Sequence, residues 1–99
     1  MENFKAIYRI LRYLERAMDY DEPDMDIISA SALGLSEARW ISILEMLADE
    51  NLISGLEIRR SSDGGAALSI SNPRITLHGL EYLQENPQML KAAEMAKGR

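Results

Sequence analysis

The most informative segment of the chain spans residues 29–51 and reads SASALGLSEARWISILEMLADEN. Ser29 and Ser36 are residue types whose side chains accept hydrogen bonds from a first helical turn, so each predicts a helix start. Gly34 lies between them, and glycine readily adopts the left-handed conformation that ends a helix. The segment therefore predicts a helix-turn-helix: a short helix through residue 33, a turn, and a second helix to about residue 50.

An amphipathic segment precedes this motif and predicts a first helix within residues 1–20. Its apolar residues recur at steps of three and four, which is the spacing of one helical face. They are Phe4, Ile7, Tyr8, Leu11, Leu14 and Met18. Asn3 is a residue type that caps helix N-termini, so we expect the helix to begin there. Basic residues follow the same spacing on another face of the helix, namely Lys5, Arg9, Arg12 and Arg16.

The segment from residue 19 to residue 26 is strongly acidic. It contains five Asp and Glu residues and Pro23. In an EF-hand loop that started at Asp19, Pro23 and Ala30 would stand at ligand positions, which argues against calcium binding of that type. We expect a solvated acidic loop that lies against the basic face of the first helix. A very short edge strand is expected at residues 26–28.

Two stretches with alternating apolar and polar residues follow the helix-turn-helix and predict a β-hairpin over residues 52–72. The apolar residues of this alternation are Leu56, Ile58, Leu68 and Ile70. The sequence SSDGG at residues 61–65 is typical of a tight turn between two strands. Pro73 is expected to end the second strand, because proline cannot donate to a strand ladder.

The remaining segment, residues 76–98, predicts two C-terminal helices. Thr76 is the expected cap of the first of them. Its apolar residues are Leu77, Leu80 and Leu83, and Gly79 in its first turn would let a neighbouring segment pack closely. Pro87 suits the first position of the last helix, and Gly98 suits its end.

This order of elements is that of a winged helix, and we predict a single α+β, mainly helical domain over residues 1–99 with a two-stranded wing. Three motifs add a closer likeness: NFKxIY at residues 3–8, ILEML at residues 43–47 and ISNPRITLxGLEYL at residues 70–83. Through them the chain resembles the YjcQ-like family of small proteins from Gram-positive bacteria and their prophages. The resemblance implies a winged-helix fold and carries over no catalytic residues.

Composition excludes several classes of function. The 99 residues include no cysteine and one histidine, His78, so disulfides, thiolate nucleophiles, Cys-ligated zinc and His-pair metal sites are excluded. No glycine loop precedes a Walker-type lysine. We therefore expect a protein that is not an enzyme and holds no cofactor or metal. We also expect a cytoplasmic protein that does not enter membranes, because no apolar run predicts a membrane span or a signal peptide.

The winged-helix prediction makes DNA binding the first functional hypothesis. The second helix of the motif would enter the major groove of double-stranded DNA while the wing touches the backbone. If the stripe of Trp40, Ile43, Leu44 and Leu47 is buried, the outward candidates for DNA contact are Arg39, Ser42 and Met46. In the wing the candidates are Arg59, Arg60 and Ser61. Arg39 is placed to read a guanine edge, or alternatively to pair with a nearby carboxylate.

Acidic residues oppose this hypothesis and support a second one. The chain has 11 Lys and Arg against 16 Asp and Glu, a net charge of -5. The predicted DNA-reading helix carries four of these acids, Glu37, Glu45, Asp49 and Glu50. Acids that face phosphates weaken binding to DNA. The second hypothesis is a protein-interaction module whose acidic surfaces at residues 19–26 and 45–50 bind a basic protein partner. The sequence leaves open whether the last helix frays or packs on a partner chain, as in a homodimer.

Overall fold

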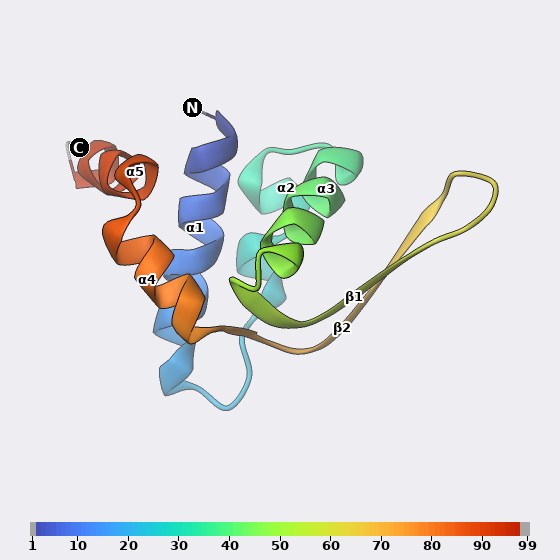
Figure 1. Cartoon of the computed structure of the whole chain (residues 1–99), viewed down its shortest axis with the longest axis horizontal. Coiled ribbons are helices and arrows are strands. Elements are labelled where there is room, and N and C mark those ends of the chain that lie inside the picture. Colours follow the sequence, from blue (N-terminus) through green and yellow to red (C-terminus); the bar gives the residue numbers. More distant parts are fainter. Residues whose placement is uncertain (1, 98–99) are drawn as a thin grey trace.

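The computed structural model describes residues 2–97 and has the predicted winged-helix order of elements (Figure 1). Helix α1 (Glu2–Arg16) is followed by two 3-10 turns, η1 (Ala17–Asp19) and η2 (Met25–Ile28), and by helices α2 (Ala30–Leu33) and α3 (Glu37–Asp49). Strands β1 (Ile53–Arg60) and β2 (Ala66–Ile75) form an antiparallel hairpin, which α4 (Leu77–Glu85) and α5 (Pro87–Lys97) follow. Figure 1 shows the hairpin projecting away from the packed helices as a wing.

The core gathers apolar side chains from α1, η2, α3 and α5. The largest fully buried ones are Ile10, Leu11, Leu14, Ile28, Ile43, Leu44 and Met89. Burial of each such side chain stabilises the fold by about 1.5–3 kcal/mol. These contacts also fix the rotation of α3 about its axis, and so they determine which of its side chains face solvent.

The helix caps predicted on either side of the α2–α3 turn are confirmed. The Ser29 hydroxyl accepts from the Ala32 N–H at 3.2 Å, and the Ser36 hydroxyl accepts from the Arg39 N–H at 3.1 Å. Gly34 adopts φ +72° and closes α2. Local hydrogen bonding therefore fixes both ends of the turn between α2 and α3.

The two ends of α1 differ from the sequence prediction. The helix includes Glu2, so Asn3 lies inside its first turn and is not the N-cap. At the other end, the α-helix stops at Arg16 and the chain tightens into η1. This change of period buries Ala17 and leaves Met18 54% exposed, so the assignment of Met18 to the buried stripe is wrong.

The acidic loop also differs from expectation. Residues 26–28 belong to the 3-10 turn η2 and not to an edge strand, because the Asp24 carboxylate caps the turn by accepting from the Asp26 N–H at 3.1 Å. The loop is held by Arg74 of β2, which donates to the carbonyl oxygens of Ala17 at 3.2 Å and of Asp21 at 2.5 Å. The acidic loop was expected to contact the basic face of α1. Instead, Arg12 pairs with Glu15 of its own helix and Arg9 bonds to Ala32.

The second strand is longer than predicted. It continues through Pro73 to Ile75, so the expected end at residues 72–73 is wrong. The register pairs Ser54 with Arg74 and then Leu56 with Ile70, which leaves Gly55 opposite a bulge of three residues. Because Pro73 sits in this bulge, no ladder hydrogen bond requires the N–H that it lacks.

The C-terminal helices close the fold against α1. Thr76 caps α4 as predicted, since its Oγ1 accepts from the Gly79 N–H at 2.9 Å. Gly79 permits a close approach, because a Cβ there would lie 2.1 Å from the Leu52 carbonyl oxygen. Leu77, the first residue of α4, is 74% exposed and lies outside the core. Met89 of α5 is fully buried, and α5 packs on α1 within the same chain. The predicted helix end at Gly98 lies outside the described residues.

Candidate nucleic-acid interface

The exposed face of α3 carries the three residues that the sequence singled out. Ile43, Leu44 and Leu47 are buried as predicted, and the half-buried Trp40 is anchored by its indole Nε1–H, which donates to the Ile28 carbonyl oxygen at 2.9 Å. The residues that share the opposite face are Arg39, Ser42 and Met46, all exposed, with Met46 at 51%. The rotation of α3 therefore presents these three residues to solvent.

Arg39 has a partner that the sequence did not indicate. Its Nη1 donates to the side-chain oxygen of Asn3, 2.9 Å away and 36 residues earlier in the chain. An amide oxygen carries no net charge, so this bond orients the guanidinium without neutralising it. The alternative interpretation placed a carboxylate beside Arg39, and the bond to Asn3 shows a neutral acceptor instead.

A groove opens beside Arg39, between the start of α1 and the α2–α3 turn. Its volume is about 750 Å³, and its charged lining residues are Lys5, Arg9, Arg39 and Glu2. Arg9 Nη2 donates to the Ala32 carbonyl oxygen at 3.2 Å, so its charge too is retained. Glu2 is the one acid among the described lining residues. We refer to Lys5, Arg9 and Arg39 as the basic trio.

The basic trio adjoins the N-terminal end of α3. Ser36, the cap of that helix, lines the same groove. The first N–H groups of a helix lack helical partners, and the helix dipole makes this end partially positive, so anions are stabilised there. The groove thus combines three cationic side chains and a helix N-terminus with a single acid, Glu2, among its described lining residues, in a chain whose net charge is negative.

The C-terminal half of α3 carries acidic side chains. Asp49 and Glu50 are exposed at its C-terminal end, and Glu45 is half-buried one turn earlier. Burial of the phenol, and secondarily the negative charge of Glu50, raises the pKa of Tyr82 in α4. Three of the four acids of this segment therefore lie toward the end away from the groove, while Glu37 is in the first turn of α3.

The wing uses its polar groups internally. Arg59 is exposed, as its strand parity predicted, but its Nη2 lies 3.3 Å from the Glu57 carboxylate. The Ser61 hydroxyl donates to the Asp63 carboxylate, which also accepts from the Gly65 N–H at 3.1 Å. These two hydrogen bonds lower the pKa of Asp63 and keep a negative charge at the tip. The side chain of Arg60 lies outside what the structure describes.

Comparison with known proteins adds the family. The model of the family described as YjcQ protein matches residues 8–98. The chain belongs to the YjcQ family. Searches of curated proteins and of solved structures gave no match. Family membership agrees with the resemblance carried by the three sequence motifs.

Among residues 2–97, no group of three or more His, Asp or Glu side chains gathers where a metal ion could be held. His78 is exposed on α4, with Nδ1 3.8 Å from the Glu81 carboxylate. No helix within the same residues is both long and apolar enough to cross a membrane.

Sequence reasoning found the stripe that contains Lys5 and Arg9 but not its place. It assigned these side chains to the acidic loop, whereas the structure turns them toward the start of α3. The signal that could have corrected this is Asn3, a short amide close to Lys5 at the start of α1. Because Asn3 lies within the first turn and does not cap the helix, its side-chain oxygen is available to accept a hydrogen bond from a residue of another element.

Proposed function

We propose that this chain is a non-catalytic winged-helix domain that binds double-stranded DNA, in the manner of a bacterial or prophage transcriptional regulator. The observation that carries the proposal is the convergence of the basic trio on one groove at the N-terminal end of α3. Cationic side chains and a helix N-terminus are the groups that proteins use to hold DNA phosphates.

The polarity of α3 suits one orientation on DNA. In helix-turn-helix proteins the N-terminal residues of the recognition helix contact base edges. Here that end carries Arg39, whose fork of donors fits the O6 and N7 acceptors of guanine. Ser42 follows on the same face, and Met46 would contact apolar base surface such as a thymine methyl group. The acidic C-terminal end would then point away from the phosphates.

The wing contributes less in this proposal. Arg59 and Arg60 would contact backbone phosphates, and Ser61 could donate only by leaving its bond to Asp63. The charged Asp63 repels phosphate at the tip. We therefore assign the main electrostatic contacts to the basic trio and secondary contacts to the wing.

The test measures binding of a fluorescently labelled duplex by anisotropy, at low salt of about 50 mM, where phosphate contacts are strongest. The double variant Lys5→Gln/Arg39→Gln should bind about tenfold or more weakly and show a salt dependence smaller by about one phosphate contact, that of Lys5, because Arg39 is assigned to a base edge. The matched control is Arg16→Gln/Lys91→Gln, which removes two exposed cations outside the groove and should bind nearly as the parent does. Absence of binding to mixed-sequence duplex and to every fragment of a genomic library would contradict the proposal.

A second candidate function is binding of a basic protein through the acidic loop. The observation in its favour is that residues 19–26 carry five acids and expose Tyr20, and that Ile27 beside them is more than half exposed. A surface both acidic and apolar suits a basic, amphipathic segment. Affinity capture at low salt with the parent chain and with Asp21→Asn/Glu22→Gln would test it. Equal retention of partners by both forms, or no retained partner, would count against it.

A further inference from the structure

The hairpin changes direction where it leaves the core, at the bulge opposite Gly55 (Figure 1). On the core side of the bulge, Ile53 and Ile75 pair with each other and are buried. On the wing side, Leu56 pairs with Ile70, which is 38% exposed. A β-bulge bends and twists its strand, so it redirects the part of the hairpin that lies beyond it. The direction of the wing is therefore determined at this bulge.

The backbone of the bulge is tightly constrained. Gly55 adopts φ +83°, and a Cβ at this position would lie 2.6 Å from the Asn72 carbonyl oxygen and 2.7 Å from that of Ser71. Both oxygens belong to the backbone, so a side chain at residue 55 would force the opposite strand to move. On that strand Asn72 adopts φ +55°, a conformation that asparagine tolerates better than most residues. Two left-handed residues on facing strands thus specify one bent backbone.

Arg74 ties the core side of the bulge to the helical part of the chain. Its Nη1 donates to the carbonyl oxygens of Ala17 at 3.2 Å and of Tyr20 at 3.4 Å, and its Nη2 donates to that of Asp21 at 2.5 Å. The guanidinium is planar and its donors have a fixed geometry, so three acceptors on one segment restrict its orientation. The base of the wing is thereby fastened to η1 and to the acidic loop.

Side-chain packing supports the wing only in part. Leu56, Ile58 and Leu68 are half-buried at the edge of the core. A pocket of about 410 Å³ lies between the acidic loop and β2, and Ile70 and Pro73 are among its lining residues. Because this space is open, packing alone would allow the wing to move toward the loop. The bulge and the bonds of Arg74 are the features that oppose such a movement.

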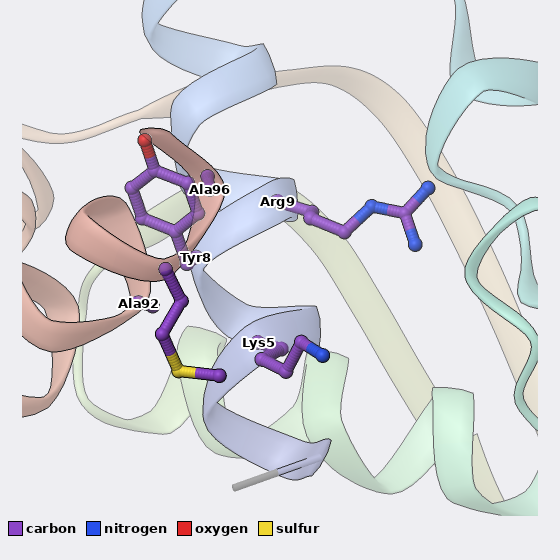
Figure 2. A pocket seen from close by; sticks show the side chains of 6 residues that line it. Lys5, Tyr8, Arg9, Ala92 and Ala96 are labelled. Atoms are coloured by element: carbon purple, nitrogen blue, oxygen red, sulfur yellow. The ribbon is translucent and has the colours of Figure 1, made fainter. Parts of the chain in front are cut away.

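The direction of the wing matters because the wing and the groove would meet the same duplex. Figure 2 shows Lys5 and Arg9 extending from α1 to the side away from α5. The wing projects on that side of the molecule as well (Figure 1). The cations of the groove and of the wing can therefore contact one duplex, provided that the wing keeps its direction.

We propose that Gly55, Asn72 and Arg74 form a rigid elbow that sets the direction of the wing. They are positioning residues, since they act through Arg59, which the elbow presents to a backbone phosphate. A wing that already has its bound direction loses less conformational freedom when DNA binds. This contribution to DNA binding rests on the proposed function, whereas the rigidity of the elbow does not.

Electron paramagnetic resonance between two spin labels measures the direction of the wing. The chain has no cysteine, so introduced cysteines carry the only labels. Ala67→Cys on the wing and Gln84→Cys on α4 replace exposed residues and report the distance between wing and core. Asp49→Cys with Gln84→Cys reports the core alone. We expect one narrow distance distribution for each pair in the otherwise unchanged chain. A broad or split distribution for the wing pair beside a narrow one for the core pair would overturn the elbow.

Two variants with matched controls identify the residues responsible. Gly55→Ala places a Cβ against backbone oxygens and should shift or broaden the wing distribution. Its control, Gly64→Ala, replaces another left-handed glycine of the hairpin where no atom lies within 4 Å, and should leave the distribution unchanged. Arg74→Gln should broaden the distribution and its control Arg59→Gln should not. If Gly55→Ala also disturbs the core pair, Arg74→Gln decides; an unchanged wing distribution in Arg74→Gln and in a folded Gly55→Ala would refute the elbow.

The anisotropy assay connects the elbow to the proposed function. Gly55→Ala should weaken binding of the duplex by about twofold, the range of one exposed ion pair lost from the wing, and Gly64→Ala should not. If Gly55→Ala moves the wing without changing DNA affinity, the elbow stands and the contribution of the wing to binding is wrong. If the parent chain binds no DNA, the proposed function fails and the distances alone decide the elbow. If DNA binds to a chain whose wing distribution is broad, the elbow is wrong and the proposed function stands.

Discussion

The α3 helix and the wing were both expected to hold DNA, and the groove at the start of α3 and the tip of the wing are built in different ways. The groove is assembled by tertiary packing, since Asn3 of α1 bonds to Arg39 of α3 across 36 residues. The wing tip is assembled by bonds within five residues, from Ser61 to Gly65. In the groove, the neutral partners Asn3 and Ala32 leave the charges of two arginines intact. In the wing, Glu57 offsets the charge of Arg59, and Asp63 adds a negative charge at the tip. Basic residues near a motif therefore predict a binding surface only once their partners are known.

The largest effect should separate the two regions by stability. Leu44→Ala removes a fully buried side chain of α3, the helix that borders the groove, and should lower the free energy of unfolding by about 2–5 kcal/mol. Ile70→Ala in the wing removes a side chain that is 38% exposed and should cost about 1 kcal/mol or less. Urea denaturation monitored by circular dichroism measures both. Equal losses would show that the wing is as much a part of the cooperative fold as the groove.

A smaller effect concerns the turns that position each region. Gly34 has φ +72°, and no atom lies within 4 Å of the position that a Cβ would take there, so Gly34→Ala carries only backbone strain, about 1–2 kcal/mol. Gly34→Asn should recover most of this loss, because asparagine tolerates the left-handed region. Gly64→Ala at the wing tip should strain a turn that can open locally, so the global unfolding midpoint should hardly move. A fall in that midpoint for Gly64→Ala would contradict the local character of the tip.

Removing one arginine from each region should weaken DNA binding to different extents. Arg39→Gln removes a charge whose partner is neutral and should weaken binding about fivefold or more, in the range of one specific contact. Arg59→Gln removes a charge already shared with Glu57 and should weaken binding by about twofold or less. Anisotropy titrations at two salt concentrations measure both. A larger loss for Arg59→Gln would place the main phosphate contacts on the wing and reverse the comparison.

The predictions that succeeded from sequence are those that depend on neighbours in the chain. Ser29, Gly34, Ser36 and Thr76 act through bonds within a few residues, so their roles follow from residue type and position. The buried stripe of α3 follows from its period. These local signals were sufficient to predict the winged-helix order.

The predictions that failed depend on contacts distant in the chain. Pro73 lies inside β2 because Gly55 on the other strand permits a bulge, which no local pattern around Pro73 reveals. Arg74 holds the acidic loop across more than fifty residues, and this role was missed for the same reason. The groove combines both cases. Lys5 and Arg9 of the groove could be predicted as part of a basic helical stripe. The element that they face depends on how α1 packs against the other helices, which the local sequence does not reveal.

The smallest effect is the pH response of the wing tip. The Ser61 hydroxyl and the Gly65 N–H lower the pKa of Asp63 below its ordinary value of 3.8. A carboxyl whose pKa is depressed on folding contributes stability that is present above its unfolded pKa and is lost as the pH falls through its folded pKa. The tip turn should therefore loosen only in acid below the ordinary value, and the Gly65 amide resonance should titrate with the folded pKa.

Asp63→Asn should remove this titration and, because it also removes the negative charge at the tip, slightly raise DNA affinity. If Asp63→Asn left the Gly65 titration in place, another group would control the turn; if it lowered DNA affinity, the view that Asp63 opposes phosphate at the tip would be wrong.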